Sequence, residues 1–133
     1  MNERSIRILA TGLGILLLFH GIDKILTGVE GIEKLFLELH LSREFAHYIT
    51  YGVYIGEVVA PILLIFGQYI KIASILVVVD MLFAIGLVYR ETLFQLGDYG
   101  EWIIETPLLF LIAALSLAVS NIGFNDGFKF KKK

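Results

Sequence analysis

The sequence has no cysteine and only two prolines among its 133 residues. Without cysteine the chain cannot form disulfides, thiolate metal sites or thiol relays, so any redox role must use something other than sulfur. None of its glycines follows a predicted strand or accompanies the lysine and hydroxyl that a phosphate-binding loop needs. A formal net charge of −2 gives no reason to expect nucleic acid as a partner.

Apolar residues, in contrast, are abundant, at 57% of the chain, and they gather into four long runs at residues 6–26, 51–69, 72–89 and 102–122. A helix that spans a bilayer needs roughly 20 apolar residues. A water-soluble domain of this size could not bury four helices that are apolar all round. We therefore predict an all-α fold, a transmembrane four-helix bundle, that forms one membrane domain over residues 1–133 and is surrounded by the lipid bilayer.

The distribution of basic residues predicts the orientation of the chain. Four spans place both termini on the same side of the membrane, and seven of the eleven basic residues belong to that side: Arg4, Arg7, Lys71, Lys129, Lys131, Lys132 and Lys133. By the positive-inside rule this side is cytoplasmic. We expect a protein of the cytoplasmic (inner) membrane with its N- and C-termini in the cytoplasm.

An amphipathic segment separates the first two spans. Its apolar residues recur at helical spacing beside several acids, at Ile32, Leu35, Phe36 and Leu39. This pattern predicts a helix lying at the outer membrane interface, and Ser42 can then cap a second short helix that leads into the second span. His40 and His47 fall in this segment, where a solvated histidine is far more common than a ligand, so we assign them no role.

Five ionisable residues lie within the predicted spans or at their ends: His20, Lys24, Glu57, Asp80 and Glu105. Small residues mark the faces on which membrane helices pack, and the carboxylates lie on or beside those faces. A rise of roughly 1.5 Å per residue puts Lys24 and Glu105 near the outer boundary and Asp80 close to the midplane, with His20 and Glu57 in between. The pattern predicts one polar cluster in the outer half of the bundle.

Charges inside a membrane cost several kcal/mol unless they are paired, hydrated or neutralised. Lys24 should therefore pair with Glu57 or Glu105, and the sequence leaves open which. One lysine among three acids leaves at least one acid without a fixed partner, for which Asp80 is the best candidate because it is deepest. His20 is the only membrane histidine, so a haem held by two histidines of one chain is excluded, and we expect no metal site.

Several sequence elements together resemble the DoxX family of integral membrane proteins. These are Arg7, Gly12, Gly14, the run Phe19-His20-Gly21-Ile22-Asp23-Lys24, the pair Gly56-Glu57, the run Met81-Leu82-Phe83-Ala84, and Glu105. The resemblance implies a four-helix membrane protein associated with membrane redox systems, since the related DoxD proteins belong to a thiosulfate:quinone oxidoreductase. Related four-helix quinone reductases use cysteines, which this chain lacks.

Our leading hypothesis is an accessory subunit that binds a quinone or another small amphiphile at His20, Lys24, Glu57, Asp80 and Glu105. It would have no intrinsic cofactor and would serve a membrane or soluble oxidoreductase partner, with a homo-oligomer as a further option. Whether the chain itself catalyses a reaction stays open. Two other interpretations also stay open: an assembly protein whose polar cluster is a structural ion-pair lock, and a small proton-coupled transporter that uses the midplane Asp80.

Overall fold

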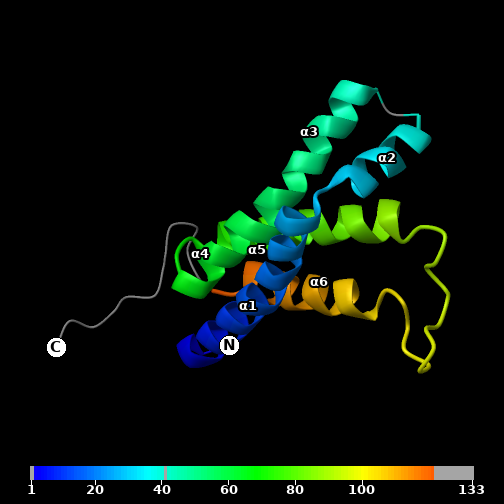
Figure 1. Ribbon diagram of the computed structural model, residues 1–133. Helices are drawn as coiled ribbons and strands as arrows, with labels where there is room; N and C mark the ends of the chain where they lie inside the picture. The colour runs from blue at the N-terminus through cyan, green and yellow to red at the C-terminus, as the bar shows by residue number, and fades with distance from the viewer. Residues whose placement is uncertain (1, 41, 122–133) are drawn as a thin grey trace.

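The computed structural model describes residues 2–40 and 42–121, and this part of the chain is helical without any β-strand. The predicted cytoplasmic tail and the end of the fourth predicted span lie outside the described residues. Figure 1 shows how the elements are arranged in space. In chain order they are α1 (Glu3–Thr27), α2 (Glu30–Glu38), α3 (Arg43–Tyr54), η1 (Ile55–Val59), α4 (Ala60–Phe66), α5 (Ile70–Phe83), η2 (Ala84–Val88) and α6 (Glu105–Ala118).

Within residues 2–40 and 42–121, three helices are long and apolar enough to cross a bilayer. They are α1, the continuous helix Arg43–Phe66 made of α3, η1 and α4, and the helix Ile70–Val88 made of α5 and η2. Only 33%, 33% and 28% of their most apolar 18-residue windows are buried inside the chain. The remaining apolar surface suits hydrocarbon rather than water, in agreement with the predicted integral membrane protein.

The fourth predicted span is shorter than expected. α6 has 14 residues, a length of about 20 Å, because the chain before it folds into an ordered loop. In this loop Trp102 pairs with Leu96 in an isolated bridge, and its indole Nε1 donates to the Leu93 carbonyl at 2.5 Å. The all-helical class is thus confirmed, whereas the full transmembrane four-helix bundle stays a prediction.

The ends of the second span differ from the predicted ones for local reasons. The second long helix begins at Arg43, well before the predicted residue 51, because Ser42 caps it by accepting a hydrogen bond from the Phe45 amide at 3.3 Å. The capping prediction is confirmed, but the expected short helix is continuous with the span. Left-handed backbone at Gly67 (φ 66°) and Tyr69 (φ 47°) forms the tight turn to α5, so the second span ends at Phe66 and not at the predicted residue 69.

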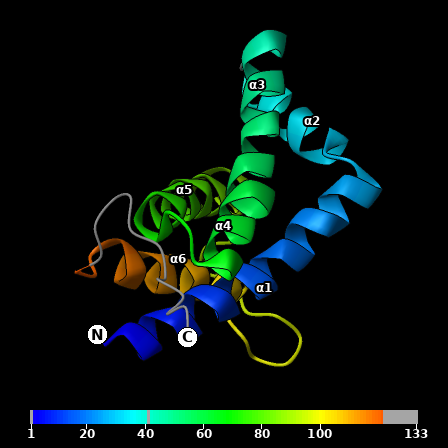
Figure 2. The same cartoon turned by 90° about the vertical axis from the view of Figure 1, so that its left-hand side faces the viewer.

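The amphipathic segment does form a helix, α2, after Gly28 ends α1 with a positive φ of 84°. α2 packs against α3 and buries Phe36. The two helices rise together beyond the rest of the molecule (Figures 1 and 2). The position of α2 at a membrane interface stays a prediction.

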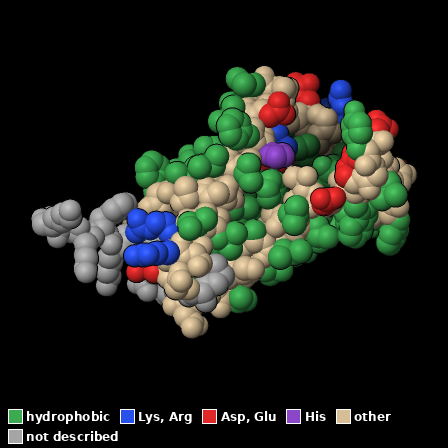
Figure 3. Space-filling view, turned by 90° about the horizontal axis from the view of Figure 1, so that it is seen from below, with side chains coloured by type: hydrophobic (Ala, Val, Ile, Leu, Met, Phe, Trp, Pro, Cys, Tyr) green, Lys and Arg blue, Asp and Glu red, His purple; other side chains and the backbone are tan. Residues whose placement is uncertain are grey.

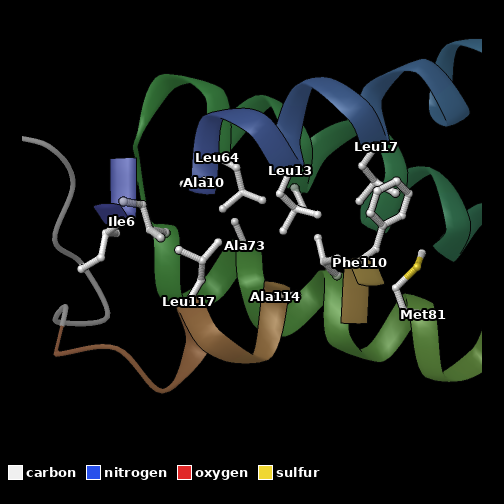
Figure 4. Close-up of a cluster of buried hydrophobic side chains, with 13 residues drawn as sticks. Ile6, Ala10, Leu13, Leu17, Leu64, Ala73, Met81, Phe110, Ala114 and Leu117 are labelled. Carbon is white, nitrogen blue, oxygen red and sulfur yellow. The ribbon is translucent and has the colours of Figure 1, made fainter. Parts of the chain in front are cut away.

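The hydrophobic core lies where α1, α4, α5 and α6 meet (Figure 4). Its buried members are Ile6, Ala10, Leu13, Leu17, Ala60, Leu64, Ile70, Ala73, Val77, Met81, Phe110, Ala114 and Leu117. The small residues Ala10, Gly14 and Gly21 of α1 are buried, as the packing-face argument predicts. α1 approaches α4 so closely that a Cβ at Gly14 would lie 2.8 Å from the Pro61 carbonyl oxygen.

The surface has a polarised distribution of side chains. In Figure 3, Lys and Arg side chains gather at one end, hydrophobic side chains spread over the middle, and acidic and basic side chains mix towards the opposite end. Arg4 and Arg7 are exposed on the first turns of α1, while Asp23 is exposed near its other end. This arrangement matches an apolar belt between two polar boundaries.

Candidate ligand-binding cavity

Glu57 lies in a π-helical segment, η1, that interrupts the second long helix. The amide of Ala60 donates to the carbonyl of Ile55, five residues earlier. Pro61 has no amide hydrogen, so the carbonyl of Glu57 cannot accept the usual bond from residue 61. A π-helical turn therefore forms where the α-helical bonding is already incomplete. Such segments are frequent at functional sites.

Gly21 brings α1 against this segment. A Cβ at position 21 would lie 2.1 Å from the Glu57 carbonyl oxygen and 2.8 Å from Val58 Cγ2. No residue other than glycine permits this approach without displacing one of the two helices. Because Lys24 follows Gly21 by three residues, the same contact brings its side chain within reach of Glu57.

Lys24 and Glu57 form an ion pair between the two helices. Lys24 Nζ donates to Glu57 Oε1, and the side chains are 24% and 6% exposed. The Tyr54 hydroxyl and the Gly28 amide also donate to the Lys24 carbonyl, at 3.2 and 2.9 Å, which holds the end of α1 in place. The partner that the sequence left open is thus Glu57.

Asp80 approaches the same region from α5. A Cβ at Gly56 would lie 2.5 Å from both Cβ and Cγ of Asp80 and 2.8 Å from its Oδ2, so this contact also requires glycine. Among the described residues, Glu57 Oε2 and Asp80 Oδ2 are buried side-chain atoms without a hydrogen-bond partner. Leaving a buried polar atom unsatisfied costs about 1–3 kcal/mol, which makes both oxygens candidates for binding a ligand.

These residues line a cavity of about 280 Å³. Its walls come from five elements besides α1: α2, α3, η1, α5 and η2. The lining residues are Lys24, Ile32, Phe36, Ile49, Gly52, Val53, Ile55, Gly56, Glu57, Leu76, Val79, Asp80, Phe83, Ala84 and Val88. Lys24, Glu57 and Asp80, which we call the polar end, are its ionisable members. The remaining lining residues are apolar or glycine.

The other two predicted site residues, His20 and Glu105, do not line this cavity. His20 is exposed on α1, where its Nδ1 lies 3.1 Å from the Leu16 carbonyl and its ring meets the Phe110 ring edge-on at 5.5 Å. Glu105 is exposed at the first turn of α6. α6 packs against α1 and α5 and contributes nothing to the cavity lining.

Sequence reasoning missed most of the cavity wall. Ile32 and Phe36 of α2 and the two π-helical segments are the main omissions. Pro61, four residues after Glu57, was an available signal for the first segment, because a proline at that spacing removes one helical hydrogen bond. η2, where the Tyr89 amide donates to the Ala84 carbonyl, has no comparable signal.

No group of three or more His, Cys, Asp or Glu side chains within residues 2–40 and 42–121 could hold a metal ion.

Comparison with protein families matches DoxX over residues 6–90, well over half of the chain. The protein belongs to the DoxX family. No curated protein and no solved structure matches the chain. The DoxX match includes all the cavity-lining residues and ends before α6, so Glu105 lies outside it.

Proposed function

We propose that this DoxX protein binds a small membrane-soluble amphiphile of the quinone type and serves as an accessory subunit of a membrane oxidoreductase system. One observation carries the proposal: an apolar cavity ends at Lys24, Glu57 and Asp80, where two buried carboxylate oxygens have no hydrogen-bond partner. Mostly apolar walls with a few converging polar groups are typical of small-molecule sites.

The size of the cavity favours a single ring. Its volume of about 280 Å³ lies just below the usual range for drug-sized ligands, about 300–1,000 Å³. The rings of Phe36 and Phe83 contribute to the wall and suit the face of a flat headgroup. A long apolar tail would have to lie outside.

The polar end can bind both redox forms of such a ring. The lysine ammonium has three donors, of which one is directed at Glu57, so another can donate to a quinone carbonyl. Carboxyl groups accept hydrogen bonds whether they are ionised or protonated. The hydroxyls of the reduced ring can therefore donate to Glu57 Oε2 and Asp80 Oδ2. Electrons would pass to or from a partner protein, in line with the redox association implied by the family resemblance.

Retention of a quinone through purification tests this proposal. We expect mass spectrometry of extracts from purified wild-type protein to show quinone in near-stoichiometric amount. Because an unpaired buried acceptor is worth about 1–3 kcal/mol, Glu57→Gln and Asp80→Asn should each weaken quinone binding roughly 5- to 150-fold and so lower the amount retained.

Glu105→Gln is the matched control, since it removes an exposed carboxylate outside the cavity and should leave retention unchanged. Repeated preparations of wild-type protein without quinone would contradict the proposal. Equal quinone content in Glu57→Gln and wild-type protein would contradict the assigned site.

The structural lock is a second candidate role for the same residues, because the Lys24–Glu57 pair directly links α1 to η1. A pure lock predicts that replacing both partners by apolar residues preserves whatever activity the protein supports. The proposed ligand site predicts instead that activity is lost with Glu57, even where stability is kept.

A further inference from the structure

Part of the cavity wall is also outer surface. Ile55, Val79, Phe83 and Val88 line the cavity and yet are 48%, 47%, 48% and 43% exposed. Gly52 lines it too and is likewise exposed. These five residues, which we call the lateral opening, come from the two long helices Arg43–Phe66 and Ile70–Val88. The cavity therefore reaches the surface between two membrane-spanning helices.

The lateral opening has no charged or hydrogen-bonding side chain, and it belongs to the apolar surface that faces hydrocarbon in a bilayer. The polar end is more enclosed, because the Glu57 side chain is only 6% exposed. The cavity thus runs from an apolar rim to a more enclosed polar end. This gradient matches a molecule with an apolar tail and a polar head.

α2 covers another side of the cavity. Phe36 lines the cavity and is 2% exposed, and Ile32 lies beside it in the lining. Glu33 of α2 and His47 of α3 lie 3.8 Å apart, so a contact outside the cavity also joins the two helices. By contrast, η2 buries none of its five residues, which leaves the side of the lateral opening without a covering helix.

We infer that the ligand enters sideways from the lipid, through the lateral opening, with its polar head leading to Lys24, Glu57 and Asp80 and its apolar tail remaining in the opening. This inference rests on the proposed function and narrows the ligand to tailed, lipid-dissolved amphiphiles. It also assigns Gly52 a role in access, because a larger side chain there would narrow the passage.

Gly52 offers a clean way to close the opening. A Cβ added at this position meets no atom within 4 Å, so a side chain can start there without moving the backbone. Glycine inside a helix is also less favourable than most residues, by roughly 1 kcal/mol relative to alanine. Gly52→Trp should therefore fold while filling the opening.

The experiment measures binding of decylubiquinone to protein in lipid nanodiscs. We expect wild type to bind it, Gly52→Ala to bind nearly as well, and Gly52→Trp to bind at least tenfold more weakly. Gly12→Trp in α1 is the control, since a Cβ there also meets nothing within 4 Å and Gly12 does not line the cavity. The same ring without its decyl tail should bind wild type at least tenfold more weakly than decylubiquinone.

The outcomes distinguish failure of this inference from failure of the proposed function. If Glu57→Gln weakens binding but Gly52→Trp does not, the ligand site stands and lateral entry is overturned. If the tailless ring binds as well as decylubiquinone, the tail does not occupy the opening. If wild type binds neither compound, both proposals fail. Should thermal unfolding show that Gly52→Trp is unstable, Val88→Trp on the opposite side of the opening tests the same closure.

Discussion

Replacing Lys24 by methionine should lower the free energy of unfolding by about 3–5 kcal/mol, because it leaves Glu57 as a buried carboxylate without its cationic partner. Replacing both partners, as Lys24→Met with Glu57→Leu, should restore most of that loss, since an apolar pair of similar volume avoids burying an unpaired charge. Denaturant unfolding of the purified protein in detergent measures both changes.

Asp23→Asn is the control for this series, because Asp23 neighbours Lys24 on α1 but is exposed, and it should change stability by less than about 0.5 kcal/mol. A Lys24→Met protein as stable as wild type would show that the ion pair contributes nothing to the fold. Quinone retention measured on the double variant separates the two roles. If Glu57 belongs to the ligand site, the double variant no longer retains quinone. If the pair is only a structural lock, the double variant retains as much quinone as wild type.

Gly21→Val should strongly disrupt the fold. Its Cβ would lie 2.1 Å from the Glu57 carbonyl oxygen, and because that oxygen is backbone, α1 and η1 must separate. Overpacking alone costs about 1–3 kcal/mol. Loss of the adjacent Lys24–Glu57 pair would add to this cost in stability. We expect little folded protein in detergent, measured as the monodisperse fraction in size-exclusion chromatography.

Gly12→Val is the matched control, since it introduces the same β-branched residue into the same helix at a place where a Cβ meets nothing within 4 Å. It should remain folded and monodisperse. Similar behaviour of the two variants would contradict the close contact between α1 and η1, and with it the geometry of the polar end.

Local sequence patterns predicted much of this architecture. The apolar runs located the three long helices because a bilayer-spanning helix is recognised by length and composition alone. Ser42 marked the start of one of them through its side-chain cap. Such signals act over a few residues and do not depend on how the helices pack.

The candidate site could be predicted only in part. Lys24, Glu57 and Asp80 were identified because ionisable residues are rare in membrane spans. The same argument included His20 and Glu105, which lie outside the cavity. The estimates of how deep each residue lies in the membrane, and on which face of its helix, assume straight helices with uniform geometry. The π-helical segment η1 and the shortened α6 depart from that assumption.

The sequence by itself therefore determined that this is a helical membrane protein with a few acids and one lysine inside its spans, because hydrophobicity and helical period are properties of the chain. Its motifs also resembled those of the DoxX family, to which the family match assigns it. Only the tertiary structure decided that Glu57 is the partner of Lys24, that Asp80 shares a cavity with them, and that the cavity opens between two long helices. The physical reason is that these features depend on helix rotation, tilt and spacing, which are set by contacts between residues far apart in the chain, such as Gly21 with Glu57 and Gly56 with Asp80.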